Sequence, residues 1–186
     1  MKTYQTGNIR NVVLLGSSKS GKTTLAEAMM FEGKVIDRRG TIEAKNTVSD
    51  NTEVEQIYQR SIYSTPLYTE FMDNKLNIID TPGQDDFVGG VISGFKVADA
   101  GVMIVNATQG VEVGTEIFAR YADQYKMPLI IGVNQLDSEK ASWETTIDSL
   151  KQTFFLLVSL YAISVITASC IGYASIKFPS QSNFNI

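Results

Sequence analysis

The segment GSSKSGKT at positions 16–23 has the composition and spacing of a phosphate-binding loop between an apolar strand and a helix. Its two glycines permit a tight turn, so that successive backbone N–H groups can point at phosphate oxygens. The Lys22 ammonium can reach the β- and γ-phosphates of a nucleotide, and the Thr23 hydroxyl can ligate Mg²⁺. The motif therefore predicts a nucleoside triphosphate site, formed by Ser17, Ser18, Lys19, Ser20, Gly21, Lys22, Thr23 and Thr24.

A second group of candidate residues is Asp80-Thr81-Pro82-Gly83, which directly follows the apolar stretch LNII. We expect Asp80 to hold Mg²⁺ through a water molecule and the Gly83 N–H to contact the γ-phosphate. A four-residue pattern of this kind is weak alone. Its place at the end of a second strand, behind a phosphate loop, makes it a strong indication of a nucleotide site.

The third motif, Asn134-Gln135-Leu136-Asp137, ends the apolar run PLIIGVN. The Asp137 carboxylate can accept hydrogen bonds from the N1–H and N2–H₂ groups of guanine, a donor pair that adenine lacks. Small GTPases carry N-K-x-D at such a position, so Gln135 replaces the usual lysine. We expect guanine selectivity to persist. We also expect a lower affinity, because the cation that packs along the base and braces the phosphate loop is lost.

The composition limits the functions open to this chain. Its 186 residues suit one domain, and a net charge of -4 gives no indication of a nucleic-acid-binding face. A single cysteine, Cys170, excludes an internal disulfide and fits a reducing compartment, and the N-terminus has no secretory signal. The chain contains no histidine, so no step can use an imidazole.

Strands and helices alternate after the phosphate loop. The patterns predict strands at 12–15, 62–72, 75–79, 101–106 and 128–134, and helices at 24–29, 112–126 and 142–154. A glycine-rich turn at 80–90 leads into a further helix that ends at Phe95, and residues 30–61 form a long polar connection. This order predicts an α/β fold with a mostly parallel sheet and helices on both faces. Functional groups should then gather at the carboxyl ends of the strands.

The motifs together resemble the GTP-binding domain of elongation factor G-type translational GTPases. The resemblance rests on GSSKSGKT, VSDNT, LNIIDTPGQDDF, ADAGVMIVNATQGVEVGTE and VNQLD, and it covers about residues 9–153. It implies a P-loop GTPase fold, GTP or GDP and Mg²⁺ as ligands, and the ribosome as partner. The family also includes ribosome-protection factors for tetracycline.

One departure from the family concerns catalysis. The family carries DTPGH, in which the histidine orients the attacking water, whereas this chain has Gln84. A glutamine does the same through its amide in many small GTPases. We therefore expect GTP hydrolysis with Gln84, Lys22 and Gly83 as catalytic residues. The alternative is a nucleotide-binding, ribosome-associated switch without useful hydrolysis.

The other departure concerns the metal. The family reads R-G-I-T before the second strand, and its threonine ligates Mg²⁺. Matching the arginine to Arg60 puts Tyr63 at the threonine position, whereas counting without gaps puts Ser61 there. Ser61 is the preferred ligand, together with Thr23 and Asp80, because a hydroxyl on a short side chain suits a metal ion.

Residues 154–176 form an uncharged apolar segment, long enough to cross a bilayer of ~30 Å. The resemblance ends near residue 153, so we expect no sixth strand and an incomplete C-terminal edge of the sheet. Three interpretations stay open: a membrane anchor, a buried replacement for the missing strand, or unrelated sequence joined by truncation or a frame change. We accordingly divide the chain into a GTP-binding domain at 1–153 and an apolar tail at 154–186. The predicted location is cytoplasmic, with a membrane-attached GTPase as the alternative.

Overall fold

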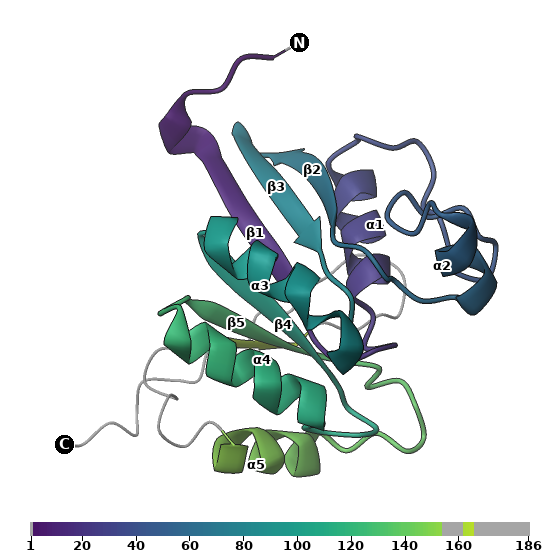
Figure 1. Cartoon of the computed structure of the whole chain (residues 1–186), viewed down its shortest axis with the longest axis vertical. Coiled ribbons are helices and arrows are strands. Elements are labelled where there is room, and N and C mark those ends of the chain that lie inside the picture. The colour runs from purple at the N-terminus through teal and green to yellow at the C-terminus, as the bar shows by residue number, and fades with distance from the viewer. Residues whose placement is uncertain (1, 154–161, 166–186) are drawn as a thin grey trace.

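A computed structural model describes residues 2–153 and 162–165 of the chain. Its sheet, within these residues, has six strands in the order β2-β3-β1-β4-β5-β6 (Figure 1). Neighbouring strands are parallel except for the antiparallel hairpin of β2 with β3. The mostly parallel α/β fold is therefore confirmed. The strands are β1 (Ile9–Leu15), β2 (Thr65–Phe71), β3 (Asn74–Asp80), β4 (Ala100–Asn106), β5 (Leu129–Asn134) and β6 (Ala162–Val165).

Helices cover both faces of the sheet, as a parallel sheet with apolar strands requires. Helix α1 lies on one face, and α3, α4 and α5 lie on the other (Figure 1). The helices are α1 (Lys22–Glu32), α2 (Glu53–Tyr58), α3 (Val88–Val97), α4 (Val113–Gln124) and α5 (Trp143–Thr153). Short 3-10 turns, η1 (Thr6–Asn8) and η2 (Asp85–Phe87), precede β1 and α3.

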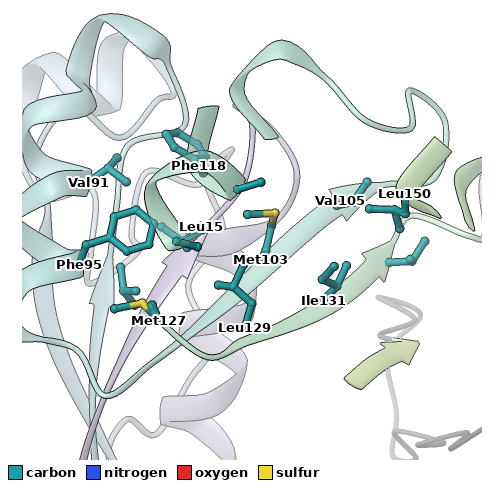
Figure 2. Close-up of a cluster of buried hydrophobic side chains, with 14 of the residues drawn as sticks. Leu15, Val91, Phe95, Met103, Val105, Phe118, Met127, Leu129, Ile131 and Leu150 are labelled. Atoms are coloured by element: carbon teal, nitrogen blue, oxygen red, sulfur yellow. The ribbon is translucent and has the colours of Figure 1, made fainter. Parts of the chain in front are cut away.

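Two apolar layers hold the helices against the sheet. The larger layer joins β1, β4 and β5 to α3, α4 and α5, and it includes Phe118 of α4, which is fully buried (Figure 2). The smaller layer lies under α1 and consists of Leu14, Ala26, Met30, Leu67 and Ile78. Alternate residues of β1 contribute to opposite layers, because successive strand side chains point to opposite faces. These layers fix β1 and α1, and so position the loop between them.

The connection expected at 30–61 contains more structure than its sequence indicated. Helix α2 forms inside it and begins with a capping box, in which Thr52 and Glu55 each bond the other's backbone N–H. The Glu55 carboxylate also accepts the N–H groups of Ile62 and Tyr63, beyond the end of the helix. The description of this segment as one long loop was therefore wrong for its last third.

Before α2, the connection is attached to helix α1 through one carboxylate. Glu27 is buried on α1 and accepts hydrogen bonds from the backbone N–H groups of Gly40 and Val48. Charged acceptors of this kind form the stronger hydrogen bonds in proteins. The otherwise irregular stretch before α2 is thus held at two points eight residues apart.

The expectation that no sixth strand follows residue 153 was wrong. Strand β6 pairs in parallel with β5, with Ala162 opposite Ile130 and Val165 opposite Val133. These four residues belong to the apolar segment 154–176, the rest of which lies outside the described residues. An apolar run has no polar face that would distinguish a strand from a helix in the sequence. Residues 162–165 form a strand because they pair with β5. Among the described residues, no helix has the length and apolar character needed to cross a bilayer.

Candidate functional site

The phosphate loop joins β1 to α1 and lies at the carboxyl ends of the parallel strands, as predicted (Figure 1). Three of its residues have a positive φ: Gly16 with 137°, Lys19 with 63° and Gly21 with 104°. A β-carbon at Gly21 would collide with the side-chain amide of Asn134. Glycine is therefore required where the loop passes the end of β5. Of the loop residues, Ser17, Ser20, Lys22 and Thr23 are buried, Ser18 and Gly21 are partly buried, and Lys19 and Thr24 are exposed.

Lys22 is the first residue of α1 and its side chain turns back under the loop. Its ammonium group donates to the carbonyls of Gly16 at 2.8 Å and Ser17 at 2.9 Å. Burial lowers the pKa of Lys22 to about 8, although the carboxylates of Asp80, Asp50 and Glu112 favour its charged form. These carbonyl contacts hold the cation at the floor of the loop, where a bound phosphate would meet it.

The loop and the end of β3 bring together the hydroxyl and carboxylate groups predicted to bind metal. The Thr23 hydroxyl donates to Oδ2 of Asp80 at 2.7 Å and lies 3.2 Å from the hydroxyl of Ser61. Ser49 donates to the same Asp80 oxygen at 2.7 Å. The other oxygen, Oδ1, is buried and has no hydrogen-bond partner among the described residues. Burial raises the pKa of Asp80, while Ser49, Lys22 and Thr23 oppose that rise.

Ser61 rather than Tyr63 faces Thr23, and the backbone before it supports the gap-free match. Tyr63 is 60% exposed, whereas the Ser61 hydroxyl lies 3.2 Å from that of Thr23. When Ser61 is matched to the threonine of R-G-I-T, Gln59 falls at the position of the glycine. Gln59 is the residue that directly follows α2, and its φ of 50° is the left-handed conformation that glycine adopts most readily. The position therefore keeps the backbone of a glycine although the side chain differs.

Asp50 is a site residue that the motif analysis left without a role. It is 4% exposed and lines the phosphate pocket with Lys22 and Ser61. Neither of its carboxylate oxygens has a hydrogen-bond partner among the described residues. Burial is the main cause that raises the pKa of Asp50 to about 6. The signal in the sequence was the string VSDNT, which contributed to the family resemblance but was not assigned to the site.

Gly83 and Gln84 follow β3 on the other side of the loop. Gly83 lies so close that a β-carbon there would come within 2.6 Å of the backbone of Ser17 and Ser18. Because Gly83 lies this close to the loop, the pocket between the loop and Ser61 is small, with a volume of about 50 Å³. Gln84 precedes η2 and lines an adjoining cavity of about 640 Å³, formed with the loop and the start of α4. Gly83 therefore lines both cavities, together with Ser18 of the phosphate loop, and Gln84 lines only the larger one.

The third motif is attached to the phosphate loop through two side-chain amides. Asn134 donates to the carbonyl of Ser20 at 2.8 Å, and Gln135 donates to the carbonyl of Lys19 at 2.9 Å. The glutamine therefore braces the phosphate loop through a neutral amide, whereas the positive charge of the usual lysine is absent. Asp137 is exposed on the turn after β5. Within the described part of the chain, its carboxylate forms no hydrogen bond or ion pair, and it is therefore available to a ligand.

The strand–loop–helix unit, the acidic end of β3 and the Asn–Asp turn after β5 together define a P-loop nucleotide-binding domain. The sequence matches the family described as the elongation factor Tu GTP binding domain over residues 7–180, and the chain belongs to this family. The match extends past residue 153, where the resemblance in motifs ended.

Relatives with known names place the chain beside elongation factor G-like proteins. It is 34% identical over 148 residues to an elongation factor G-like protein of Mycobacterium tuberculosis, covering 80% of this chain and 21% of the relative. It is 35% identical over 147 residues to one of Thermotoga maritima, covering 79% and 21%. A mitochondrial ribosome-releasing factor 2 of Meyerozyma guilliermondii is 34% identical, covering 78% and 17%. The chain thus spans about a fifth of the length of these curated relatives.

Solved structures agree with this assignment. A crystal structure of a Thermus thermophilus protein superposes with a TM-score of 0.75 at 32% identity, covering 78% of this chain and 22% of that one. A bacterial selenocysteine-specific elongation factor superposes with a TM-score of 0.68 at 22% identity, covering 86% and 25%, which supports the fold. The chain is therefore a member of the elongation factor Tu GTP binding domain family, and it is similar in sequence to elongation factor G-like proteins.

Proposed function

We propose that this domain binds GTP with Mg²⁺ and hydrolyses it to GDP and phosphate, as part of a translation factor that acts on the ribosome. The observation that carries the proposal is the convergence of Lys22, Thr23, Ser61 and Asp80 at one end of the phosphate loop. Such a set combines a phosphate-binding cation with the oxygen ligands of a metal. The names of the relatives, elongation factor and ribosome-releasing factor, support the ribosome as partner. A cytoplasmic location is part of the same proposal.

The oxygen groups beside the loop fit a magnesium ion. Thr23 and Ser61 would ligate it through their hydroxyls, and Asp80 would hold it through water. The unpartnered Oδ1 of Asp80 and the unpartnered carboxylate of Asp50 leave acceptors free beside these hydroxyls. When bound, the ion would neutralise charge on the β- and γ-phosphate oxygens.

The protein's own groups would bind the phosphates, orient the attacking water and recognise the base. The loop N–H groups and Lys22 would hold the phosphates, and the Gly83 N–H would contact the γ-phosphate. Gln84 would orient the attacking water through its amide, since the chain has no histidine. Asn134, Gln135 and Asp137 would hold the guanine end, with Asp137 giving the choice of guanine over adenine.

A second candidate function is a switch that binds GTP without hydrolysing it usefully. It is favoured by Gln84, which stands where the family carries histidine. Phosphate release from a single turnover distinguishes the two, measured with and without ribosomes. If ribosomes accelerate the release of phosphate, the domain is a GTPase. If GTP binds tightly but no phosphate is released in either condition, the domain is a switch without useful hydrolysis.

The nucleotide site itself is tested with Lys22→Ala. Removing a cation that faces the triphosphate should weaken binding of fluorescent mant-GTP by about 2–5 kcal/mol, the usual cost of losing one partner of a buried charge pair. Lys126→Ala is the matched control, because Lys126 is exposed and, among the residues that the structure describes, its ammonium pairs only with Asp123. Superimposable titration curves for wild type and Lys22→Ala would show that the loop does not bind phosphate.

A further inference from the structure

Arg60 is a cationic side chain at the phosphate pocket and lies outside the three nucleotide-binding motifs. It lines the pocket together with Lys22, Ser61 and Gly83. Within residues 2–153 and 162–165, its guanidinium forms no hydrogen bond and no ion pair, and the residue is exposed. A charged group beside the phosphates, with its donors unused by the protein, is available to a ligand.

The backbone on both sides of Arg60 is held firmly. Its own N–H donates to the carbonyl of Glu55 at 3.2 Å. The next two N–H groups, of Ile62 and Tyr63, donate to the Glu55 carboxylate at 3.0 and 3.1 Å. One residue of α2 therefore fixes the stretch that carries both Arg60 and Ser61. A side chain that acts on a reacting group needs such a fixed base.

A further cation beside Lys22 and the metal ion would accelerate phosphoryl transfer. Negative charge develops on the leaving β–γ bridging oxygen and spreads over the γ-phosphate oxygens. Lys22 is buried and donates to the carbonyls of Gly16 and Ser17, which fixes it at the floor of the loop. Gln84 carries no charge. An arginine offers five N–H donors in a planar fork that suits phosphate oxygens.

We propose that Arg60 is a catalytic residue of the GTPase, an arginine finger supplied by the chain itself, which contacts the γ-phosphate and the β–γ bridging oxygen. The proposal rests on the proposed hydrolysis of GTP. In that step the water oxygen forms a bond to the γ-phosphorus, and the bond from this phosphorus to the bridging oxygen breaks. GDP leaves with the electron pair, and the proton of the water goes to the phosphate product. Arg60 stabilises the charge on the leaving oxygen and transfers no proton.

The test compares Arg60→Ala and Arg60→Lys with the wild type in single-turnover release of phosphate from bound GTP, with and without ribosomes. Arg60→Ala should lower the rate on the order of 10³-fold, within the range of arginine fingers. Arg60→Lys should be almost as slow as Arg60→Ala, because an ammonium group cannot donate to two phosphate oxygens at once as the planar guanidinium does. The affinity for mant-GTP should stay within about threefold of the wild type in both variants, as expected for a contact made mainly in the transition state.

Arg120→Ala is the matched control, since this arginine lies on α4 with its side chain 75% exposed and only a loose 3.9 Å pair with Glu116. It should hydrolyse GTP at the wild-type rate. A wild-type rate in Arg60→Ala, or a loss of rate explained by lost GTP affinity, would overturn the role of Arg60 while hydrolysis itself stands. Absence of phosphate release from the wild type in both conditions would overturn the proposed hydrolysis, and Arg60 as its catalyst with it.

Discussion

The side-chain amide of Gln135 donates a hydrogen bond to the backbone carbonyl of Lys19 at 2.9 Å, across 116 positions of sequence. This bond joins the turn after β5 to the phosphate loop. Both residues have positive φ, 61° for Gln135 and 63° for Lys19, so each backbone is turned to allow the contact. The base end and the phosphate end of the site are thereby joined through one neutral side chain.

Gln135→Ala should weaken GTP and GDP binding equally, because the loop that it braces contacts both nucleotides. Loss of one neutral hydrogen bond corresponds to about 1 kcal/mol, or roughly fivefold in affinity. Gln135→Lys should restore binding, since an ammonium can donate to the same carbonyl. Titrations with mant-GTP and mant-GDP measure this, and Gln124→Ala on the exposed end of α4 is the control. A change confined to one nucleotide would contradict the bracing role.

Asp137→Asn should change the preferred base. In the wild type, GTP and GDP should outcompete ATP by up to about 10⁴-fold, because a base without the donor pair leaves the carboxylate unpaired. An asparagine instead complements the N1–H and O2 of xanthine, so xanthine nucleotides should displace mant-GDP better from the variant than guanine nucleotides do. Equal competition by ATP and GTP in the wild type would refute the assignment of this turn.

Gln84→Ala should remove ribosome-stimulated hydrolysis and leave GTP affinity nearly intact. The amide is expected to touch the nucleophilic water and not the groups that bind nucleotide, and a misplaced water costs on the order of 10²-fold in rate. Gln84→His should raise the stimulated rate if the missing imidazole limits turnover. Quenched-flow measurement of phosphate release decides this. An unchanged rate in Gln84→Ala would mean that another group orients the water.

Asp50→Asn should stabilise the nucleotide-free, magnesium-free protein near neutral pH. Burial raises the pKa of Asp50 from an ordinary value of 3.8 to about 6, so the folded state holds its proton at a pH where the unfolded chain has lost it. The stability that this carboxyl contributes is full below pH 4 and is lost as the pH rises through 6. The variant should gain on the order of 2 kcal/mol at pH 7 and nothing at pH 4.

Urea unfolding between pH 4 and pH 7 tests the role of Asp50. Asp37→Asn, at a position of the same connection outside the phosphate pocket, is the control and should show no such pH dependence. If Asp50→Asn gains the same stability at pH 4 as at pH 7, the effect does not come from an unpaired buried charge.

The phosphate loop could be predicted from sequence because its contacts are local. A glycine-bounded turn between a strand and a helix defines its own geometry, and residues 16–23 satisfy it without reference to the rest of the chain. The capping box of Thr52 and Glu55 was also readable, and it marks the start of α2. Overlooking it left residues 30–61 described as a loop.

The remaining features depend on packing between distant segments. Ser61 rather than Tyr63 faces Thr23 because Gln59 turns the chain and Glu55 holds both ends of that turn. The burial of Asp50 and the bond from Gln135 to Lys19 likewise arise only when separate segments meet. Strand β6 forms because it pairs with β5, and an apolar sequence does not show that such a pairing exists.

The attachment of the connection to Glu27 has a consequence for local opening. Between α1 and α2 the connection has no hydrophobic core of its own, and one carboxylate accepts the N–H groups of Gly40 and Val48. Both amides should therefore exchange with deuterium together, at one shared rate, and much faster than amides of β1. Glu27→Ala, which removes both acceptor oxygens, should speed the exchange of both amides and leave β1 unchanged. The stretch that carries Ser49 and Asp50 is then a single cooperative unit, which opens as a whole without unfolding the sheet.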